Sequence, residues 1–194
     1  MNWFEAKNGI TRNFVCGYCG SDITSQLGYY ATEYRDGRPI EVANIRICHK
    51  CGKPTFINSD GKTVPSATYG KNIEYLPKEI EELYNEARRC FSIDAYTSVI
   101  MCCRKLLMHI ACENGAEENL AFGKYVQYLK DNGYVAKPTH KLADAILKYG
   151  NIANNKLEIY TKEDATNIML FTETILKNIY ELPSIYDELS GKNE

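Results

Sequence analysis

Two short cysteine clips near the N-terminus constrain this chain more than any other feature. Cys16 and Cys19 lie in the sequence CGYCG, and Cys48 and Cys51 lie in CHKCG. The spacing of each Cys-x-x-Cys clip directs two sulfurs toward one ion, and the glycine after the second cysteine relieves the tight backbone turn. Two such clips around a strand-rich stretch predict a closed four-cysteine zinc ribbon with one structural Zn²⁺ per chain. The metal would fold a segment that is too small to fold on its own core.

Other uses of these cysteines have to be weighed against zinc. Two disulfides would need an oxidising compartment, but the first residues, MNWFEAKNGITRNF, contain no apolar run that could serve as a signal peptide. A redox site normally needs only one Cys-x-x-Cys clip. A catalytic zinc needs an open position, which four thiolates do not leave. His49 is an alternative ligand within the second clip, although both clips are already complete.

Composition and charge set the expected compartment and the expected partners. Reduced cysteines favour the cytoplasm, and no stretch approaches the roughly 18 apolar residues of a membrane span. The net charge is −2, so broad electrostatic capture of nucleic acid is not expected. A local patch in the ribbon could still combine stacking surfaces with phosphate contacts. The side chains that would form this patch are Tyr29, Tyr30, Tyr34, Arg35, Arg38 and Arg46.

The residue pattern predicts an α+β protein with two domains. The expected parts are a β zinc ribbon at 1–58, a linker at 59–75 and an all-α bundle at 76–190. Within the ribbon, residues 27–47 have the pattern of a β-hairpin whose turn is Arg35-Asp36-Gly37-Arg38, and residues 55–57 form a third short strand. The linker is predicted from its cluster of Asn, Ser, Asp, Gly and Pro residues.

From Leu76-Pro77 onward the apolar residues recur with a period of about 3.6, which predicts about five amphipathic helices in an up-and-down bundle. Asp94 is expected to cap the second helix. Thr161 and Asp164 resemble a capping box at the start of the fifth helix, which is expected to end near Leu182. The third and fourth helices are expected at about 119–131 and 138–149. The remaining cysteines, expected to pack in the core, are Cys90, Cys102, Cys103 and Cys112.

Four short motifs of the helical half follow one another in a distinctive order. They are Leu76-Pro77, Glu86-Ala87-Arg88, Cys103-Arg104-Lys105-Leu106-Leu107 and Gly150-Asn151. Behind a zinc ribbon, this order resembles the family called domain of unknown function 4145, and the resemblance covers essentially the whole chain. It implies a helical domain related to the HEPN bundles. It also implies a homodimer and an association with restriction or other phage-defence systems.

The resemblance allows one catalytic test. HEPN ribonucleases use an arginine and a histidine about four to six residues apart near the last two helices. In LKYGNIANNK, Lys148 stands where the arginine is expected, and Asn154 and Asn155 stand where the histidine is expected. Lysine lacks the planar fork of arginine, and asparagine is no general acid or base near neutral pH. These departures argue against ribonuclease chemistry and leave Lys148, Asn151, Asn154 and Asn155 as candidate binding residues.

Arg104 and His109, in RKLLMH, form an arginine–histidine pair with suitable spacing in the second helix. Five residues of a regular helix turn by about 500°, so the two side chains diverge by about 140° and are not expected to share a substrate. Arg104, also a candidate binding residue, is instead expected to form an ion pair with a carboxylate such as Glu86 or Glu113 inside the bundle. His109 is expected to be at the surface or partly buried.

Together these observations favour a non-catalytic binding module. In this interpretation the zinc ribbon and the helical bundle form an adaptor that recognises a protein partner, in prokaryotic or phage defence or counter-defence. Two alternatives stay open. One is a nucleic-acid-binding protein that uses Arg35 and Arg38 of the ribbon, and the other is a degenerate HEPN-type ribonuclease.

Overall fold

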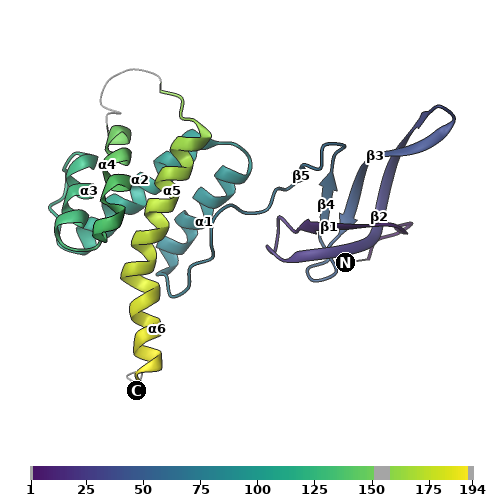
Figure 1. Cartoon of the computed structure of the whole chain (residues 1–194). Coiled ribbons are helices and arrows are strands. Elements are labelled where there is room, and N and C mark those ends of the chain that lie inside the picture. The colour runs from purple at the N-terminus through teal and green to yellow at the C-terminus, as the bar shows by residue number, and fades with distance from the viewer. Residues whose placement is uncertain (1, 151–157, 192–194) are drawn as a thin grey trace. The chain divides into compact units, whose positions relative to one another are not determined.

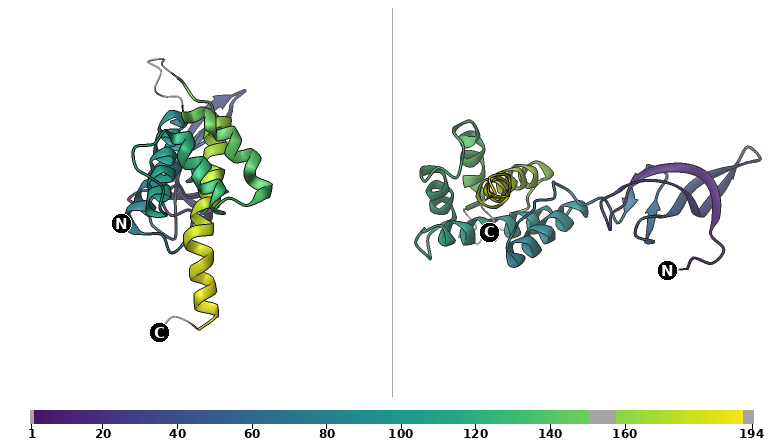
Figure 2. Two further views of the ribbon diagram at one scale, coloured as in Figure 1. Left: turned by 90° about the vertical axis from the view of Figure 1, so that its left-hand side faces the viewer. Right: turned by 90° about the horizontal axis from the view of Figure 1, so that it is seen from below.

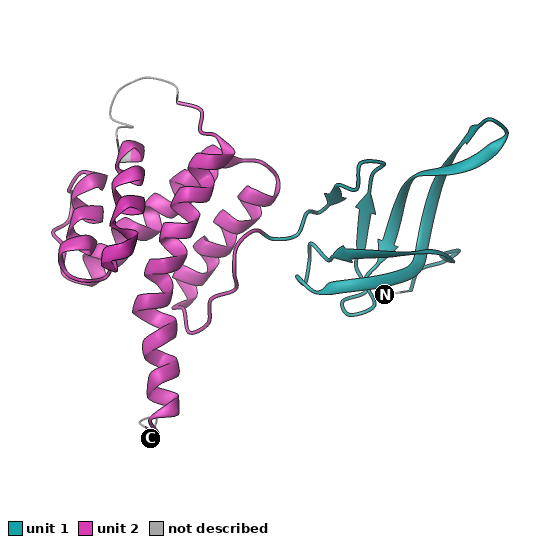
Figure 3. Ribbon diagram, in the orientation of Figure 1, with its two compact units in different colours: residues 1–68 teal, residues 69–194 magenta. Residues whose placement is uncertain are grey.

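The computed structural model describes residues 2–150 and 158–191, and the chain divides into two compact units (Figure 1 and Figure 3). Unit 1 spans Met1–Thr68 and contains the described strands, whereas unit 2 spans Tyr69–Glu194 and contains the described helices. This arrangement confirms the α+β class that the sequence predicts.

Unit 1 is built on one antiparallel sheet with the strand order β1-β2-β3-β4-β5. Its strands are β1 (Lys7–Val15), β2 (Asp22–Arg35), β3 (Arg38–Ile47), β4 (Pro54–Ile57) and β5 (Thr63–Val64). The predicted hairpin is confirmed, because Arg35 pairs with Arg38 across the turn. Asp36 and Gly37 have φ of 51° and 73°, as a two-residue turn of type I′ requires. The predicted third strand at 55–57 lies within β4.

The sequence pattern does not predict β1 or the first residues of β2. Along β1, KNGITRNFV, only Phe14 is buried, so the strand has no apolar face that alternation could show. It is held instead by backbone pairing with β2, which is interrupted by an irregularity between Asn8 and Arg12. Pairing of this kind depends on the neighbouring strand and has no local signal in the sequence.

The β2–β3 hairpin extends beyond the other strands (Figure 1). β1 pairs with β2 only as far as Gly28, and β4 pairs with β3 only from Asn44. Residues 31–40 are consequently all exposed. We call residues 32–41 the arm, because they form a two-stranded extension with both faces in solvent over most of its length.

A small cluster of side chains forms the core of unit 1. Phe14, Ile23 and Ile57 pack around the buried cysteines Cys16 and Cys48. Because so few apolar side chains are buried, hydrophobic burial contributes little to the stability of this unit. We therefore expect its fold to depend on whatever holds the cysteines together.

Arg46 is fully buried in the sheet, so its predicted place in a surface patch is wrong. Its guanidinium donates hydrogen bonds to Asn44 Oδ1 (2.9 Å) and to the carbonyl of Gln26 (3.1 Å). It also donates to the Tyr30 hydroxyl (3.2 Å), and it lies 3.5 Å from a carboxylate oxygen of Glu41. A buried charge persists only with such partners, so these strands fold around the arginine.

Unit 2 contains five helices among the described residues when α5, a π-helical segment and α6 are counted as one continuous rod (Figure 1 and Figure 2). The helices are α1 (Lys78–Ser92), α2 (Tyr96–Glu113), α3 (Phe122–Asp131), α4 (His140–Ile146), α5 (Lys162–Leu176) and α6 (Leu182–Leu189). The π segment is Lys177–Glu181, and short 3₁₀ turns at Lys137–Thr139 and Leu147–Gly150 flank α4. The predicted number of helices is confirmed.

Two predicted helix boundaries are wrong. Asp94 does not cap α2, because it adopts a φ of 61° and accepts a hydrogen bond from Tyr96 (2.5 Å), while Ala95 occupies the cap position. The last helix does not end near Leu182 but continues to Leu189. Pro183 falls in the first turn of α6 after the π segment, where a proline is tolerated. The predicted capping box of Thr161 and Asp164 is confirmed.

The core of unit 2 forms around α2, which packs against α1, α3 and α5. Its apolar stripe is fully buried, as the 3.6-residue period predicts. Prominent core residues from α2 and α5 are Val99, Ile100, Leu107, Ile110, Ile168, Phe171 and Ile175. This core is much larger than that of unit 1, so we expect unit 2 to be stable without a metal.

Residues 69–75, which we call the strap, pack on the helices of unit 2. The ring of Tyr69 stacks on Phe91 with 3.6 Å between the ring centroids, and Ile73 is only 4% exposed. The segment predicted as a linker, 59–75, is thus divided: its first part belongs to unit 1, where β5 pairs with β4, and the strap belongs to unit 2.

Three glutamates of the last helical rod hold the strap. Glu173 accepts a hydrogen bond from the backbone N–H of Lys71 (3.1 Å), and Glu181 accepts one from the N–H of Glu74 (2.9 Å). Further along, Glu188 accepts a hydrogen bond from the Tyr75 hydroxyl (2.7 Å). Arg88 of α1 donates to the Tyr69 carbonyl at the start of the strap (2.9 Å). These bonds replace the regular pairing that an extended segment lacks.

Candidate metal centre

Four cysteine sulfurs come together in unit 1. The Sγ atoms of Cys16, Cys19, Cys48 and Cys51 all lie within 4.8 Å of one another. The distance is 3.7 Å between Cys16 and Cys51 and 3.8 Å between Cys19 and Cys48. A tetrahedron with metal–sulfur bonds of about 2.3 Å has sulfur–sulfur edges of about 3.8 Å, whereas a disulfide requires about 2.0 Å. The distances fit a four-cysteine metal site and exclude disulfides within the cluster.

The two clips have the same backbone geometry. In the loop between β1 and β2, the N–H of Gly20 donates to the carbonyl of Cys16 (2.8 Å), and in the loop between β3 and β4, Gly52 donates to Cys48 (2.8 Å). Both glycines have a left-handed φ, 66° at Gly20 and 69° at Gly52. Only glycine adopts this conformation without steric cost, which explains its place after the second cysteine of each clip.

The thiols of the cluster differ strongly in acidity. Hydrogen bonds from the backbone and the side chain of Ser21 lower the pKa of Cys19 to about 6. A backbone hydrogen bond from Lys53 acts to lower the pKa of Cys51, but burial and the three neighbouring cysteines together raise it to about 12. A negative charge on one thiolate therefore raises the pKa of the neighbouring thiols, so they are harder to deprotonate. A cation between the sulfurs would balance this repulsion, which is what a thiolate-bound metal does.

The cluster is enclosed on most sides. Cys16 and Cys48 are buried, Cys51 is half-buried and Cys19 is exposed. The indole Nε1 of Trp3 donates to the carbonyl of Gly52 (2.9 Å) and so attaches the start of the chain to the second clip. The four sulfurs complete a tetrahedral ligand set without the exposed His49.

Lys148 lies in the 3₁₀ turn after α4 and contacts the capping box of α5. Its Nζ donates to Asp164 Oδ1 (2.7 Å), and the Tyr149 hydroxyl donates to the same oxygen (3.0 Å). Burial would raise the pKa of Asp164, but hydrogen bonds from Lys148, Thr161 and Tyr149 outweigh it and hold this pKa well below its usual range. Lys148 therefore reinforces a helix start.

Arg104 and His109 of α2 have separate partners. The Arg104 guanidinium donates to the Tyr149 carbonyl and lies over the ring of Phe122, 4.8 Å from its centroid. Burial lowers the pKa of Arg104. His109 instead lies 3.3 Å from Glu113, one turn further along α2. The ion pair predicted for Arg104 with Glu86 or Glu113 is wrong, because among the described residues its side chain turns toward Tyr149 and Phe122.

The other candidate binding residues are at the surface or outside the described part. Arg35 and Arg38 are exposed at the tip of the arm, where the Arg35 guanidinium lies 3.4 Å from Glu33. Asn151, Asn154 and Asn155 lie outside the described residues. The structure thus brings Arg104 and Lys148 into contact with the same residue, Tyr149, and it places Arg35 and Arg38 in the other unit.

Comparison with known proteins bears on the helical half. The sequence model of the family described as Domain of unknown function (DUF4145) matches residues 85–192. The chain belongs to this family. No curated protein and no solved structure matches the chain. In the part of the chain that the structure describes, every helix is too short or too polar to cross a membrane.

One feature of this DUF4145 chain that sequence reasoning missed is a row of apolar side chains across the sheet. Tyr29 of β2 pairs with Ile45 of β3, Ile45 pairs with Phe56 of β4, and Phe56 pairs with Val64 of β5. We call these four residues the apolar row. Phe56 is 41% exposed and Val64 is 63% exposed. A hollow of about 200 Å³ is lined by Tyr29, Ile45 and Phe56 of the row. The row depends on strand register, so the sequence alone carries only a weak signal for it.

Two neighbouring cysteines of the DUF4145 region, Cys102 and Cys103, are not activated. Burial raises the pKa of Cys102 to about 11 and that of Cys103 to about 12. A cysteine nucleophile needs a lowered pKa and access to solvent, and both of these side chains are buried. Cys102 and Cys103 pack in the core as predicted, and Cys90 and Cys112 are half-buried and pack against it.

Proposed function

We propose that this chain is a non-catalytic binding module, in which a metal-clamped ribbon and a helical bundle act as a protein-interaction adaptor in prokaryotic or phage defence or counter-defence. The observation that carries the proposal is the apolar row. Phe56 and Val64 lie exposed and Tyr29 and Ile45 half-buried, on a unit that buries very few apolar residues of its own. A contiguous exposed apolar surface on a small domain is typical of a protein-binding site.

The arrangement of the candidate catalytic groups supports a non-catalytic role. Arg104 binds a backbone carbonyl, Lys148 binds Asp164, and His109 binds Glu113. General acid–base catalysis needs groups that reach one substrate together, within hydrogen-bond distance of the transferred proton. These three side chains each have a structural partner and no common target among the described residues.

We further propose that the metal is Zn²⁺, that one ion binds per chain and that it is structural. Four thiolates at tetrahedral spacing form the ligand set that zinc prefers in such ribbons. With all four positions taken by sulfur, the ion has no position for water and serves the fold.

Native mass spectrometry of the protein purified from its own host tests the proposal, because one spectrum reads bound metal, subunit number and companions. We expect one zinc per chain, a homodimer and a protein companion. Phe56→Gln should release the companion. Ile93→Gln, which changes a 70% exposed side chain of unit 2, should retain it. A companion that is held equally by both variants, or a protein that binds nothing, would contradict the role of the apolar row.

A nuclease assay tests the catalytic alternative directly. Purified protein should leave RNA intact. RNA cleavage that disappears in both Lys148→Ala and His109→Ala would establish a ribonuclease and refute the proposal. Cleavage that persists unchanged in both variants would indicate a contaminating enzyme.

The tip of the arm favours nucleic-acid binding as a second candidate function. Tyr34 is 76% exposed and precedes Arg35, whose side chain is 65% exposed. An exposed aromatic ring and an exposed guanidinium at one tip are groups that can stack on bases and contact phosphates. This candidate predicts salt-dependent binding to short RNA or DNA that is lost in Arg35→Ala/Arg38→Ala. Absence of binding at low salt would eliminate it.

A further inference from the structure

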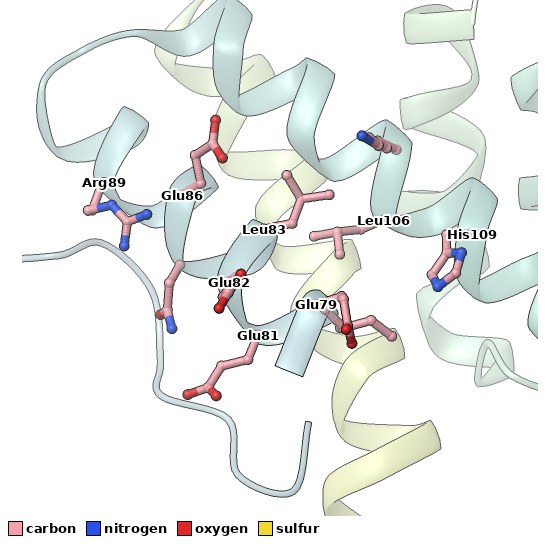
Figure 4. A pocket seen from close by; sticks show the side chains of 11 residues that line it. Glu79, Glu81, Glu82, Leu83, Glu86, Arg89, Leu106 and His109 are labelled. Carbon is pink, nitrogen blue, oxygen red and sulfur yellow. The ribbon is translucent and has the colours of Figure 1, made fainter. Parts of the chain in front are cut away.

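A pocket of about 770 Å³ lies between α1 and α2 on the surface of unit 2 (Figure 4). Its floor is apolar and consists of Ile80 and Leu83 from α1 and Leu106 from α2. Figure 4 shows Leu83 and Leu106 projecting toward each other between the two helices. Ile80 and Leu106 are buried and Leu83 is half-buried, so the floor already belongs to a rigid part of the core.

The wall formed by α1 is acidic. Four exposed glutamates of α1, Glu79, Glu81, Glu82 and Glu86, line the pocket together with one cation of the same helix, Arg89. Glu79, Glu82 and Glu86 follow one another at spacings of three and four residues. Among the described residues none of them forms an ion pair. Like charges at this spacing repel one another and destabilise a helix. The wall therefore retains carboxylates that the fold itself does not neutralise.

The wall formed by α2 has the opposite character. Lys105 and His109, four residues apart, line the pocket on this side. Lys105 is exposed and has no ion-pair partner within the described part of the chain, while His109 contacts Glu113 outside the pocket lining. The pocket thus offers an apolar floor, an α1 edge on which four carboxylates outnumber the single cation Arg89, and a cation, Lys105, on the α2 edge.

We propose that this pocket binds an amphipathic helical segment of a partner protein, with Lys or Arg residues along the edge that faces α1. Helices bind grooves between helices by placing an apolar stripe on the floor, and charges on the two flanks fix their orientation. Glu79 and Glu86 are two turns apart, about 10 Å along α1. The partner segment should therefore carry cations at two or three positions spaced by three or four residues. This inference deepens the proposed protein-interaction function and rests on it.

A second copy of α6 does not fit this pocket. The exposed apolar residues of α6 include Leu182 and Leu189, but the charges between them are Asp187 and Glu188. Acidic side chains on that helix would meet the acidic wall of α1, so the two surfaces repel each other. The occupant favoured by charge is a basic helix from a different protein.

The test uses the full chain and a fluorescein-labelled synthetic peptide, an amphipathic helix of Leu, Ala and Lys with lysines along one edge, followed by fluorescence anisotropy. We expect saturable binding that weakens with salt. Glu82→Gln/Glu86→Gln should weaken it by about tenfold. The matched control Glu117→Gln/Glu118→Gln removes the same charge from exposed glutamates outside the pocket and should leave the affinity unchanged.

The floor of the pocket is tested by a second pair of variants. Leu83→Ala should weaken binding, whereas Leu182→Ala, which truncates an exposed leucine of α6, should not. Thermal melts establish that each variant is folded. Equal loss in the pocket and control variants, binding of the same peptide with Glu in place of Lys, or no binding at all would overturn the inference. If the host companion is still released by Phe56→Gln in those cases, the proposed adaptor function stands and only this site fails.

Discussion

Removal of the metal should unfold unit 1 and leave unit 2 intact. Unit 1 buries four apolar side chains other than cysteine among its described residues: Phe14, Ile23, Ile47 and Ile57. Burial of each contributes about 1.5–3 kcal/mol, or about 6–12 kcal/mol for the four. A structural zinc in a small module contributes about 10–16 kcal/mol at neutral pH. The metal therefore outweighs the core, and stripping it removes the larger part of what holds the ribbon.

The chain carries its own reporter for this experiment. Its only tryptophan, Trp3, donates its indole N–H to the carbonyl of Gly52 in the second clip. A strong zinc chelator should shift the tryptophan emission to the red, while the helical signal in far-UV circular dichroism, which comes from unit 2, stays constant. Re-addition of Zn²⁺ should restore the emission.

A matched pair of variants separates ligation from general thiol effects. Cys16→Ser should give the red-shifted emission without chelator, because it removes a buried ligand from the cluster. Cys112→Ser, a half-buried cysteine of unit 2, should behave like the wild type. Trp3 emission that is unchanged in verified metal-free protein, or an equal shift in both variants, would refute the reasoning.

Three further outcomes follow from single contacts. Asp164→Asn should lower the stability of unit 2 by about 1–2 kcal/mol because it weakens the cap of α5, whereas Lys148→Ala, with a 60% exposed side chain, should cost about 1 kcal/mol or less. Since the folded pKa of Asp164 is depressed, its contribution is full above the unfolded pKa and is lost as the pH falls through the folded pKa. The melting temperatures of wild type and Asp164→Asn should therefore begin to approach each other below about pH 4 and come together only in stronger acid; a constant difference would contradict this. Ile73→Ala should destabilise unit 2 by about 2–5 kcal/mol, and Ile93→Ala by about 0.5 kcal/mol or less, as measured by urea denaturation. Arg46→Ala should destabilise unit 1 by about 3–5 kcal/mol, since it leaves buried partners unsatisfied, while Arg35→Ala at the arm tip should change Trp3-monitored stability by about 0.5 kcal/mol or less.

Local signals in the sequence predict the parts of the structure that local physics decides. The Cys-x-x-Cys clips with their glycines, the Asp36-Gly37 turn and the Thr161–Asp164 capping box each need only a few adjacent residues, and each is present. The helices follow from their apolar period because each one buries a single stripe.

Features that depend on distant neighbours could not be predicted. Arg46 has the sequence context of a surface strand residue, and only the pairing of β2 with β3 shows that its partners surround it. Arg104 turns toward Tyr149 instead of a glutamate because of how α2 meets the turn after α4. The apolar row needs the register of four strands, which no short segment specifies.

The strap sets where the helical domain physically begins. The family match starts at residue 85, in the middle of α1, but Tyr69 stacks on Phe91 and Ile73 is buried in the same core. A fragment that begins at residue 85 would lose half of α1 and the whole strap. The part of the helical core that they cover would then be exposed to solvent. The cooperative unit starts at Tyr69, so recombinant fragments and domain fusions of this chain should keep residues 69–84 attached to the helices.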